Sequence, residues 1–313
     1  MKAQFWQEKK VLVTGAGGFV GSNLVPLLKT TNAKIVAVDH SDYDLEEQTQ
    51  VRDLLSDVKP DIVFHLAGLV GGIMANKKRP AEFSYNNLIM GAMMLHESQA
   101  FGVQKYITLI GSCSYPGEIS RAIHEDDLWN GYPQEESAPY SVAKKMAVVL
   151  AQSYRRQYGF NAIVLVPGNI YGPHDNFDLK TSHVTPALIS KFLTAKERDV
   201  DEVSAWGTGR PVRDFLYIGD ACNAIMKSAE NYSGEGIINI ASGVPTSIKE
   251  LVETVAKKTG YIGRINWDKS MPDGQAVKLL NVDRMHKSLD FKPKTSLAEG
   301  IGKTVDWFIH EHN

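Results

Sequence analysis

The chain has 313 residues, enough for one large domain or for one domain with a smaller lobe. Lys and Arg total 34 against 36 acidic residues, and the resulting net charge of −2 argues against a surface for nucleic acid or membrane. We expect a protein of a reducing compartment such as the cytoplasm, because two cysteines make no disulfide framework and no apolar run resembles a signal peptide or a membrane span.

The N-terminal region predicts a strand, a glycine-rich turn and a helix in succession. The strand covers residues 10–14, and the segment Gly-Ala-Gly-Gly-Phe-Val-Gly at 15–21 follows it. Glycines at such a turn allow the backbone to approach a pyrophosphate, which the N-terminus of the next helix stabilises. A second strand, residues 35–38, ends in Asp39, whose carboxylate can bind both ribose hydroxyls of an adenosine. We therefore predict a dinucleotide site that includes Gly15, Gly17, Gly18, Phe19, Val20, Gly21 and Asp39.

Strands and helices alternate through about residue 170. Further strands are predicted at 61–65, 106–110 and 162–166, with helical patterns near 45–57, 81–102 and 139–158. This alternation predicts a doubly wound parallel sheet of the Rossmann type, covered by helices on both faces. The segments that follow the last three strands, 65–68, 111–116 and 167–172, should face one cleft, because ligands bind beyond the carboxyl ends of such strands.

The pattern is less regular after residue 170. Strands at 214–218 and 237–240 and a helix at 247–260 are separated by polar, turn-rich stretches. We interpret residues 1–172 as a dinucleotide-binding domain. Residues 173–313 are then mainly a substrate-binding lobe, with some segments that return to the main sheet.

Tyr140 and Lys144 are four residues apart in the predicted helix at 139–158, so they lie on the same helix face. A nearby ammonium favours phenolate, and we expect Lys144 to lower the pKa of Tyr140 toward neutrality. A tyrosine tuned in this way can exchange a proton with a carbonyl or hydroxyl oxygen. The pair alone is more typical of a solvated helix face, but the dinucleotide loop favours catalysis.

Taken together, these motifs resemble the extended short-chain dehydrogenase/reductase family of sugar-nucleotide epimerases and dehydratases. The shared parts are the glycine loop, His65–Gly68, a serine-bearing strand end, the Tyr140/Lys144 pair and Asn169–Gly172. Further segments resemble the GDP-L-fucose synthases within it: Cys113 before Tyr115-Pro116, then 171–176, 182–187, 206–207, 213–216, Pro272-Asp273-Gly274 and 278–280. The resemblance covers nearly the whole chain.

The resemblance implies a reaction in which GDP-4-keto-6-deoxy-D-mannose is epimerised at carbons 3 and 5 and then reduced at carbon 4. Both carbons flank the ketone, so loss of either proton gives an enolate with its charge on the carbonyl oxygen. Tyr140 fits the donor to that oxygen, and Lys144 fits the group that tunes it and holds the nicotinamide ribose. By resemblance, Cys113 is the base and His183 the acid of epimerisation. Thiols and imidazoles titrate close enough to neutrality for this task.

The remaining assignments also follow from the resemblance. A cysteine such as Cys113 can instead be a small buried hydrophobe, and His183 a hydrogen-bonded loop residue. The family implies a homodimer and no metal site. It assigns further cofactor contacts to Leu66, Ala67, Gly68, Pro167, Gly168, Asn169, Ile170 and His183, and GDP-sugar contacts to Lys191, Trp206, Arg213 and Asp273.

Two positions depart from the family pattern. A serine or threonine usually lies four residues before the tyrosine of the Tyr-Pro pair, but counting back from Tyr115 reaches Gly111. We choose the adjacent Ser112 as its replacement. The family generally uses NADP(H) and holds the extra phosphate with arginines, whereas this loop carries Gly17 and the second strand ends in Asp39. A carboxylate repels a 2′-phosphate, so Asp39 favours NAD(H) where the resemblance favours NADP(H).

Two other functions stay open at this point. One is a related epimerase or 4-keto-reductase that acts on another GDP-linked deoxy sugar. The other is a protein without catalysis that senses a dinucleotide and regulates a partner. Such a sensor has no need of Tyr140, Lys144, Cys113 and His183 together.

Overall fold

A computed structural model describes residues 2–179, 181–271 and 273–312. Met1, Lys180, Pro272 and Asn313 lie outside the described residues, and with them one position of the 272–274 segment noted above. Within the described part of the chain, no helix is both long and apolar enough to cross a membrane.

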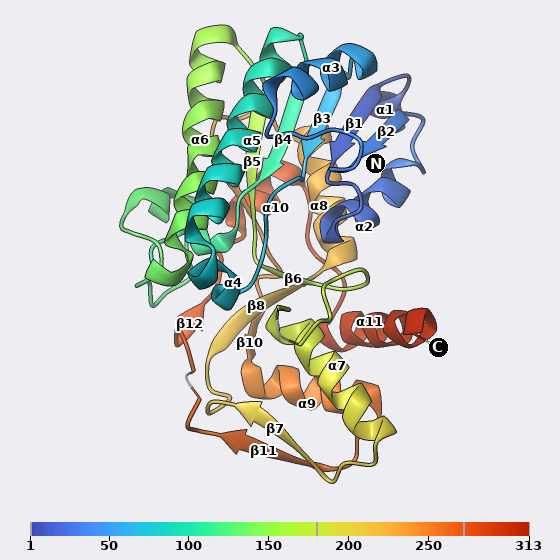
Figure 1. The fold of residues 1–313 in the computed structure, drawn as a ribbon, viewed down its shortest axis with the longest axis vertical. Helices are drawn as coiled ribbons and strands as arrows, with labels where there is room; N and C mark the ends of the chain where they lie inside the picture. Colours follow the sequence, from blue (N-terminus) through green and yellow to red (C-terminus); the bar gives the residue numbers. More distant parts are fainter. Residues whose placement is uncertain (1, 180, 272, 313) are drawn as a thin grey trace.

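Six parallel strands form the main sheet in the order β2-β1-β3-β4-β5-β9 (Figure 1). Each of the five strands predicted up to residue 170 is present, which confirms the doubly wound parallel fold. The sixth strand, β9, pairs with β5 and supplies one edge of the sheet. The strands are β1 (Lys10–Thr14), β2 (Lys34–Val38), β3 (Ile62–His65), β4 (Lys105–Leu109), β5 (Ala162–Pro167) and β9 (Ile238–Ile240).

Helices cover both faces of this sheet, because alternate residues of each buried strand point to opposite sides. Leu12 and Val63 pack with the helices on one face, and Val11 and Phe64 with those on the other. The first face carries α3 (Gln48–Val58), α5 (Pro80–Ala100) and α6 (Ala138–Tyr158); the second carries α1 (Ala3–Trp6), α2 (Phe19–Leu28), α8 (Ile218–Asn231) and α10 (Asp283–Leu289).

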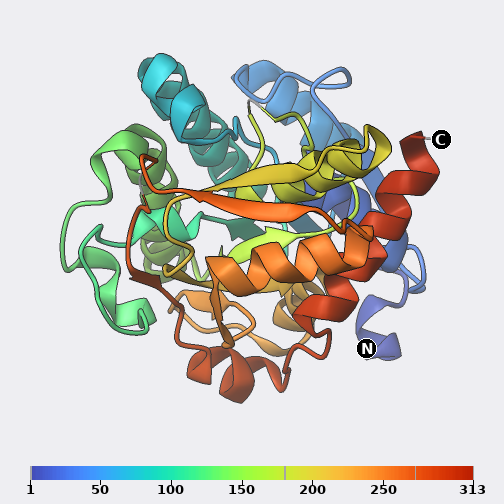
Figure 2. The same cartoon turned by 90° about the horizontal axis from the view of Figure 1, so that it is seen from below.

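A smaller lobe lies beyond the carboxyl ends of the main strands, at the bottom of Figure 1. Its own apolar core is formed mainly by three helices, of which α9 and α11 run side by side in Figure 2. The helices are α7 (Val184–Glu197), α9 (Ile248–Thr259) and α11 (Leu297–His312). The strands are β6 (Asn169–Tyr171), β7 (Glu202–Trp206), β8 (Val212–Tyr217), β10 (Pro245–Ser247), β11 (Arg264–Asp268) and β12 (Val277–Lys278).

The order of the strands indicates where a ligand would bind on the main sheet. The chain passes from β1 outward to β2 and then returns to the other side of β1 as β3, so the direction of winding reverses between β1 and β3. Ligands of open α/β sheets bind outside the carboxyl ends of the strands at such a reversal. Short helices lie in the connections that border this region: α4 (Ile73–Lys78), and the 3-10 turns η1 (Ser112–Ser114), η2 (Glu125–Trp129) and η3 (Glu135–Ser137).

Candidate active site

The glycine loop between β1 and α2 is shaped for close backbone contacts. Gly15 has a φ of +68°, and a Cβ at this position would lie 2.7 Å from the backbone nitrogen of Ala67. Only glycine therefore allows the loop to lie this close to the turn after β3. Among the described residues, no side chain caps the N-terminus of α2, so the amides of its first turn are available to an anion.

Asp39 lies directly against this loop. The Gly17 amide donates to both carboxylate oxygens of Asp39, at 2.8 and 3.0 Å. A Cβ on residue 17 would lie 2.9 Å from Oδ2 of Asp39. Glycine at this position therefore allows the loop to lie against the end of β2. The free amides, the close backbone and the acidic side chain together fit the pyrophosphate and the adenosine ribose of a dinucleotide.

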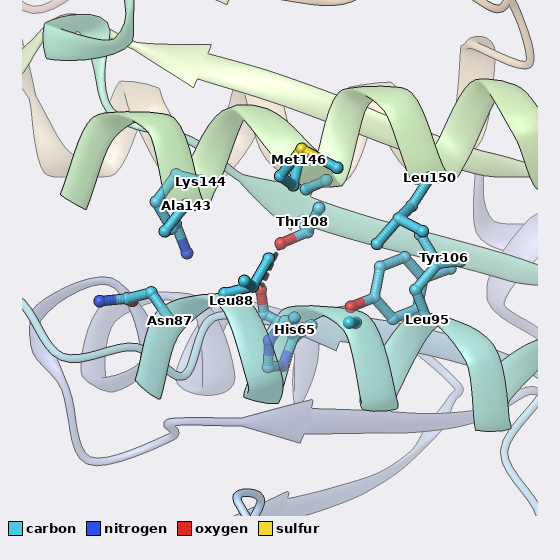
Figure 3. Close-up of a pocket in the computed structure, with 13 residues that line it drawn as sticks. His65, Asn87, Leu88, Leu95, Tyr106, Thr108, Ala143, Lys144, Met146 and Leu150 are labelled. Carbon is cyan, nitrogen blue, oxygen red and sulfur yellow. Dashed lines mark hydrogen bonds between the residues drawn. The ribbon is translucent and has the colours of Figure 1, made fainter. Parts of the chain in front are cut away.

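His65 stabilises the ends of the central strands. Its Nδ1 lies 2.9 Å from the Thr14 hydroxyl on β1, and the Thr108 hydroxyl on β4 donates to the His65 carbonyl oxygen, as the dashed line in Figure 3 shows. Complete burial, with a smaller effect of the Lys144 charge, lowers the pKa of His65 to about 3. The ring is therefore neutral at physiological pH and has a structural role beside the glycine loop.

Three side chains of the predicted site meet at the carboxyl end of β4. Gly111 precedes the turn η1, which carries Cys113, and Tyr140 lies in the first turns of α6. A Cβ on Gly111 would lie 2.9 Å from the sulfur of Cys113 and 3.8 Å from the hydroxyl of Tyr140. Lys144 follows one turn later on α6, and its ammonium points toward α5 in Figure 3. The structure thus brings the Tyr–Lys pair and the thiol together.

The expected lowering of the Tyr140 pKa is wrong for the free protein. Burial raises the pKa of Tyr140, and the charge of Cys113 raises it further. Burial also lowers the pKa of Lys144 to about 8, an effect that Cys113 partly opposes. Burial is the largest cause of both shifts, so the free protein holds a protonated tyrosine beside a lysine whose pKa is about 8.

Ser112 and His183 have no side-chain hydrogen bond that fixes their positions among the described residues. Within the described residues, the Ser112 hydroxyl makes no hydrogen bond, whereas the neighbouring Ser114 donates to the Ser141 carbonyl oxygen. His183 is the N-cap residue of α7, and its ring makes no hydrogen bond to a described residue. The His183 side chain is exposed to solvent, but protein atoms surround much of the ring. The desolvation that these atoms cause lowers the pKa of His183.

The four predicted substrate residues all belong to the lobe. Lys191 on α7 donates to the Ser204 carbonyl oxygen of β7, and Trp206 at the end of β7 is 64% exposed. Asp273 accepts hydrogen bonds from the amide and the hydroxyl of Thr208, close to Trp206 in the chain. A Cβ on Gly274 would lie 3.5 Å from Nη2 of Arg213. Arg213 therefore lies beside the turn at residues 273–274, which carries Asp273.

Sequence reasoning assigned no role to two side chains next to these groups. Asn87 on α5 is buried and donates to the Leu69 and Phe83 carbonyl oxygens, while its own Oδ1 has no hydrogen-bond partner in the part of the chain that the structure describes. This oxygen and the ammonium of Lys144 both adjoin Gly68, and Figure 3 shows the two side chains on facing helices. The second is Lys278 on β12. Asn87 carries no local signal in the sequence, and Lys278 was noted only as part of the segment 278–280, because each reaches the site through tertiary structure.

The parallel sheet, the glycine loop with its acidic partner and the Tyr–Lys pair define a dinucleotide-dependent enzyme that acts on a carbonyl or hydroxyl group. Residues 11–241 match the NAD dependent epimerase/dehydratase family, and the chain belongs to this family.

Named relatives extend over nearly the whole chain. It is 41% identical over 301 residues to a GDP-L-fucose synthase of Sinorhizobium fredii, with 96% of each chain covered. Among solved structures, a GDP-L-fucose synthetase from Naegleria fowleri superposes with a TM-score of 0.91 at 28% sequence identity, and the match covers 98% of this chain and 95% of that one. The NADP-bound form of the same protein superposes with a TM-score of 0.90 at 27% sequence identity and the same coverage. A GDP-D-glycero-L-gluco-heptose synthase from Campylobacter jejuni superposes with a TM-score of 0.90 at 27% sequence identity, and the match covers 99% of both chains.

Proposed function

We propose that this chain converts GDP-4-keto-6-deoxy-D-mannose to GDP-L-fucose, by epimerisation at carbons 3 and 5 followed by reduction at carbon 4. The observation that carries the proposal is the meeting of the Tyr140 hydroxyl and the Cys113 sulfur at Gly111. A proton donor for the carbonyl oxygen and a thiol for the adjacent carbons are the two groups this reaction needs in one place. The names and full-length similarity of the relatives support the same substrate.

Tyr140 donates a hydrogen bond to the carbon 4 oxygen throughout the reaction. This bond stabilises the enolate that forms when a proton leaves carbon 3 or carbon 5. Because burial raises the pKa of Tyr140, the hydroxyl carries its proton when the ketone binds. The reduced nicotinamide, when bound, supplies the hydride to carbon 4, and Tyr140 gives its proton to the oxygen in that step. Lys144 holds the nicotinamide ribose and stabilises the tyrosinate that remains.

Cys113 and His183 exchange the ring protons. Cys113 takes the proton from one face of the sugar, and His183 returns a proton to the other face from the loop that begins α7. Opposite faces are required, because return of a proton to the face it left would restore the original configuration. Ser112 is proposed as a second donor to the carbonyl oxygen.

The proposed cofactor is NADP(H), with NAD(H) also accepted. The NADP-bound relative from Naegleria fowleri supports the phosphorylated form. Asp39 has both oxygens directed at Gly17, a geometry that suits a free ribose diol and gives no positive charge to a 2′-phosphate. The remaining contacts proposed for the cofactor are Gly15, Gly18, Phe19, Val20, Gly21, Leu66, Ala67, Gly68, Pro167, Gly168, Asn169, Ile170 and His183.

For the nucleotide sugar we propose contacts from the lobe. Arg213 and Lys191 supply positive charge for the diphosphate, and Trp206 offers an exposed ring that can pack against the base or the sugar. Asp273 is held by Thr208 in an orientation that leaves acceptor capacity for hydroxyl groups.

A homodimer is proposed through the outer faces of α5 and α6. These helices lie side by side in Figure 1 and expose apolar side chains at Tyr85, Leu88, Val142, Met146 and Val149. An apolar face on two adjacent helices is typical of a surface that another subunit covers. Light scattering after gel filtration measures the mass directly, and a monomer at micromolar concentration would refute the proposed homodimer.

Neither Cys113 nor Cys222 forms a disulfide, which suits a reducing compartment such as the cytoplasm.

Product analysis tests the proposed reaction. The protein is incubated with GDP-4-keto-6-deoxy-D-mannose and NADPH or NADH, and the sugar is identified by NMR. Formation of GDP-L-fucose is the expected result. A reduced sugar without inversion at carbons 3 and 5 would identify a simple ketoreductase. If the substrate is unchanged while GDP-linked heptoses or other deoxy sugars react, the chain acts on another GDP-sugar. Dinucleotide binding without any turnover would identify a sensor.

A further inference from the structure

Two side-chain hydrogen bonds anchor the turn η1, which carries Cys113. Ser114 is fully buried, and its hydroxyl donates to the carbonyl oxygen of Ser141 on α6, at 3.3 Å. Tyr115 is also buried, and its hydroxyl donates to Oδ1 of Asn239 on β9, at 2.6 Å. The turn is therefore tied both to the helix of the Tyr–Lys pair and to an edge strand of the main sheet.

Asn239 is a polar residue in a strand that is otherwise apolar, and it is fully buried between two isoleucines. Its Oδ1 accepts from Tyr115, and its Nδ2 donates to the carbonyl oxygens of Ile123 and Asn281, at 3.0 and 3.1 Å. Its backbone amide donates to Oε1 of Glu125. A buried amide is costly unless such bonds are made, and a satisfied network fixes one arrangement of the segments that it joins. Asn239 thus holds together the segment after Cys113, the connection that leads to α6 and the segment after β12.

The Tyr115 hydroxyl contributes this link rather than packing. Burial raises the pKa of Tyr115, so the hydroxyl keeps its proton and acts as the donor. The ring belongs to the apolar core on the side of the sheet that α5 and α6 cover, and a phenylalanine would keep that contact. Among the described residues, the sulfur of Cys113 makes no hydrogen bond of its own. Its place beside Tyr140 therefore depends on the backbone of the turn.

We propose that Tyr115 and Asn239 are positioning residues that hold the Cys113 thiol at the reacting carbons. This inference rests on the proposed function, because it takes the thiol as the base of epimerisation. Without the bond between them, the turn stays tied to α6 through Ser114 but gains freedom at its other end, so the sulfur moves relative to Tyr140. A displacement of about 1 Å in an active site can slow a reaction step by roughly 100-fold.

Alkylation by iodoacetamide tests this role in the free, full-length protein. The chain has two cysteines, and Cys222 is buried with its pKa raised to about 12, so the reagent reports on Cys113. Tyr115→Phe removes only the hydroxyl. Tyr261→Phe is the matched control, because this buried tyrosine lies in the core of the lobe and donates to the Val200 carbonyl oxygen at 2.9 Å. Loss of one hydrogen bond should lower the melting temperature of both variants. We expect alkylation to become roughly 2- to 10-fold faster in Tyr115→Phe alone, because the turn opens more often.

Deuterium uptake at carbons 3 and 5 of the proposed substrate gives the second measurement. In Tyr115→Phe it should fall by roughly 10-fold or more, while the Kd for NADPH stays at the wild-type value. Asn239→Leu removes the acceptor and keeps a similar volume, so it should change alkylation and deuterium uptake in the same directions. Tyr261→Phe should change neither.

Three outcomes would overturn the proposal. If Tyr115→Phe melts at a lower temperature but is alkylated at the wild-type rate, the network only stabilises the fold. Equal acceleration in Tyr261→Phe would show a general loosening of the protein. Faster alkylation with wild-type deuterium uptake would show that the anchor does not set the reach of the thiol. If Tyr115→Phe does not fold, the same criteria apply to Asn239→Leu. Alkylation needs no turnover, so a failure of the proposed reaction in product analysis is separate from a failure here.

Discussion

Replacement of Tyr140 by phenylalanine separates catalysis from folding. The Tyr140 hydroxyl makes no hydrogen bond within the described residues, and the ring contact with Phe83, at 6.3 Å between centroids, is retained by phenylalanine. The free energy of unfolding should therefore change by less than about 1 kcal/mol. Loss of the proton donor should slow reduction by roughly 100-fold or more, which corresponds to about 2.7 kcal/mol in the activation barrier.

The assay follows NADPH consumption at saturating GDP-4-keto-6-deoxy-D-mannose, with cofactor binding measured separately by fluorescence. Tyr132→Phe is the matched control, because Tyr132 is 68% exposed and its hydroxyl makes no hydrogen bond to a described residue. We expect normal cofactor affinity for both variants and a low kcat only for Tyr140→Phe. Near-normal turnover in Tyr140→Phe would refute the assignment of this hydroxyl as the donor to carbon 4.

Four further predictions concern the neighbouring groups. Asp39→Ala should raise the ratio of kcat/KM for NADPH over NADH; if wild type strongly prefers NADPH and the ratio does not rise, Asp39 has no part in cofactor choice. Cys113→Ser and His183→Asn should each slow deuterium uptake at carbons 3 and 5, and wild-type exchange in both would remove the epimerase half of the proposal. Gly111→Ser should also slow this exchange, since its Cβ would lie 2.9 Å from the Cys113 sulfur and displace the thiol; an unaltered rate would contradict that geometry. Because burial lowers the pKa of Lys144 to about 8, the ammonium loses its charge as pH rises through that value, and kcat for reduction should fall above pH 8 in a pH–rate profile.

The sequence was sufficient for the parts of the site that depend on local pattern. The glycine loop predicted the strand-to-helix turn, and the spacing of Tyr140 and Lys144 predicted a shared helix face, because both features are set by residues close together in the chain. The place of Cys113 near the ligand side of the sheet was also accessible, because residues 111–116 follow a strand of the parallel sheet. Its role beside Tyr140 was predicted from the family resemblance alone.

Properties that depend on burial were not accessible in the same way. The direction of the Tyr140 pKa was predicted incorrectly, because the sequence shows the nearby ammonium but not how completely the phenol is desolvated. Lys278 was recognised only as part of a motif. Its position beside Arg213 results from the pairing of β12 with β8, two strands that are far apart in the chain. The helix α7 was also missed, because its apolar residues recur only weakly with helical spacing and tertiary packing defines it. The helix α8 was not predicted as an element, although its apolar residues do recur with helical spacing.

The pairing of β9 with β5 has a consequence for how the chain folds. Along the chain, β9 of the main sheet comes after β8 of the lobe, and the next strand, β10, again belongs to the lobe. A ribosome must therefore release most of the polypeptide before the sheet can close, and the unpaired edge of β5 stays exposed during synthesis. Because such closure depends on contacts between distant residues, we expect slow and cooperative folding, in which the cofactor half does not become stable ahead of the substrate half.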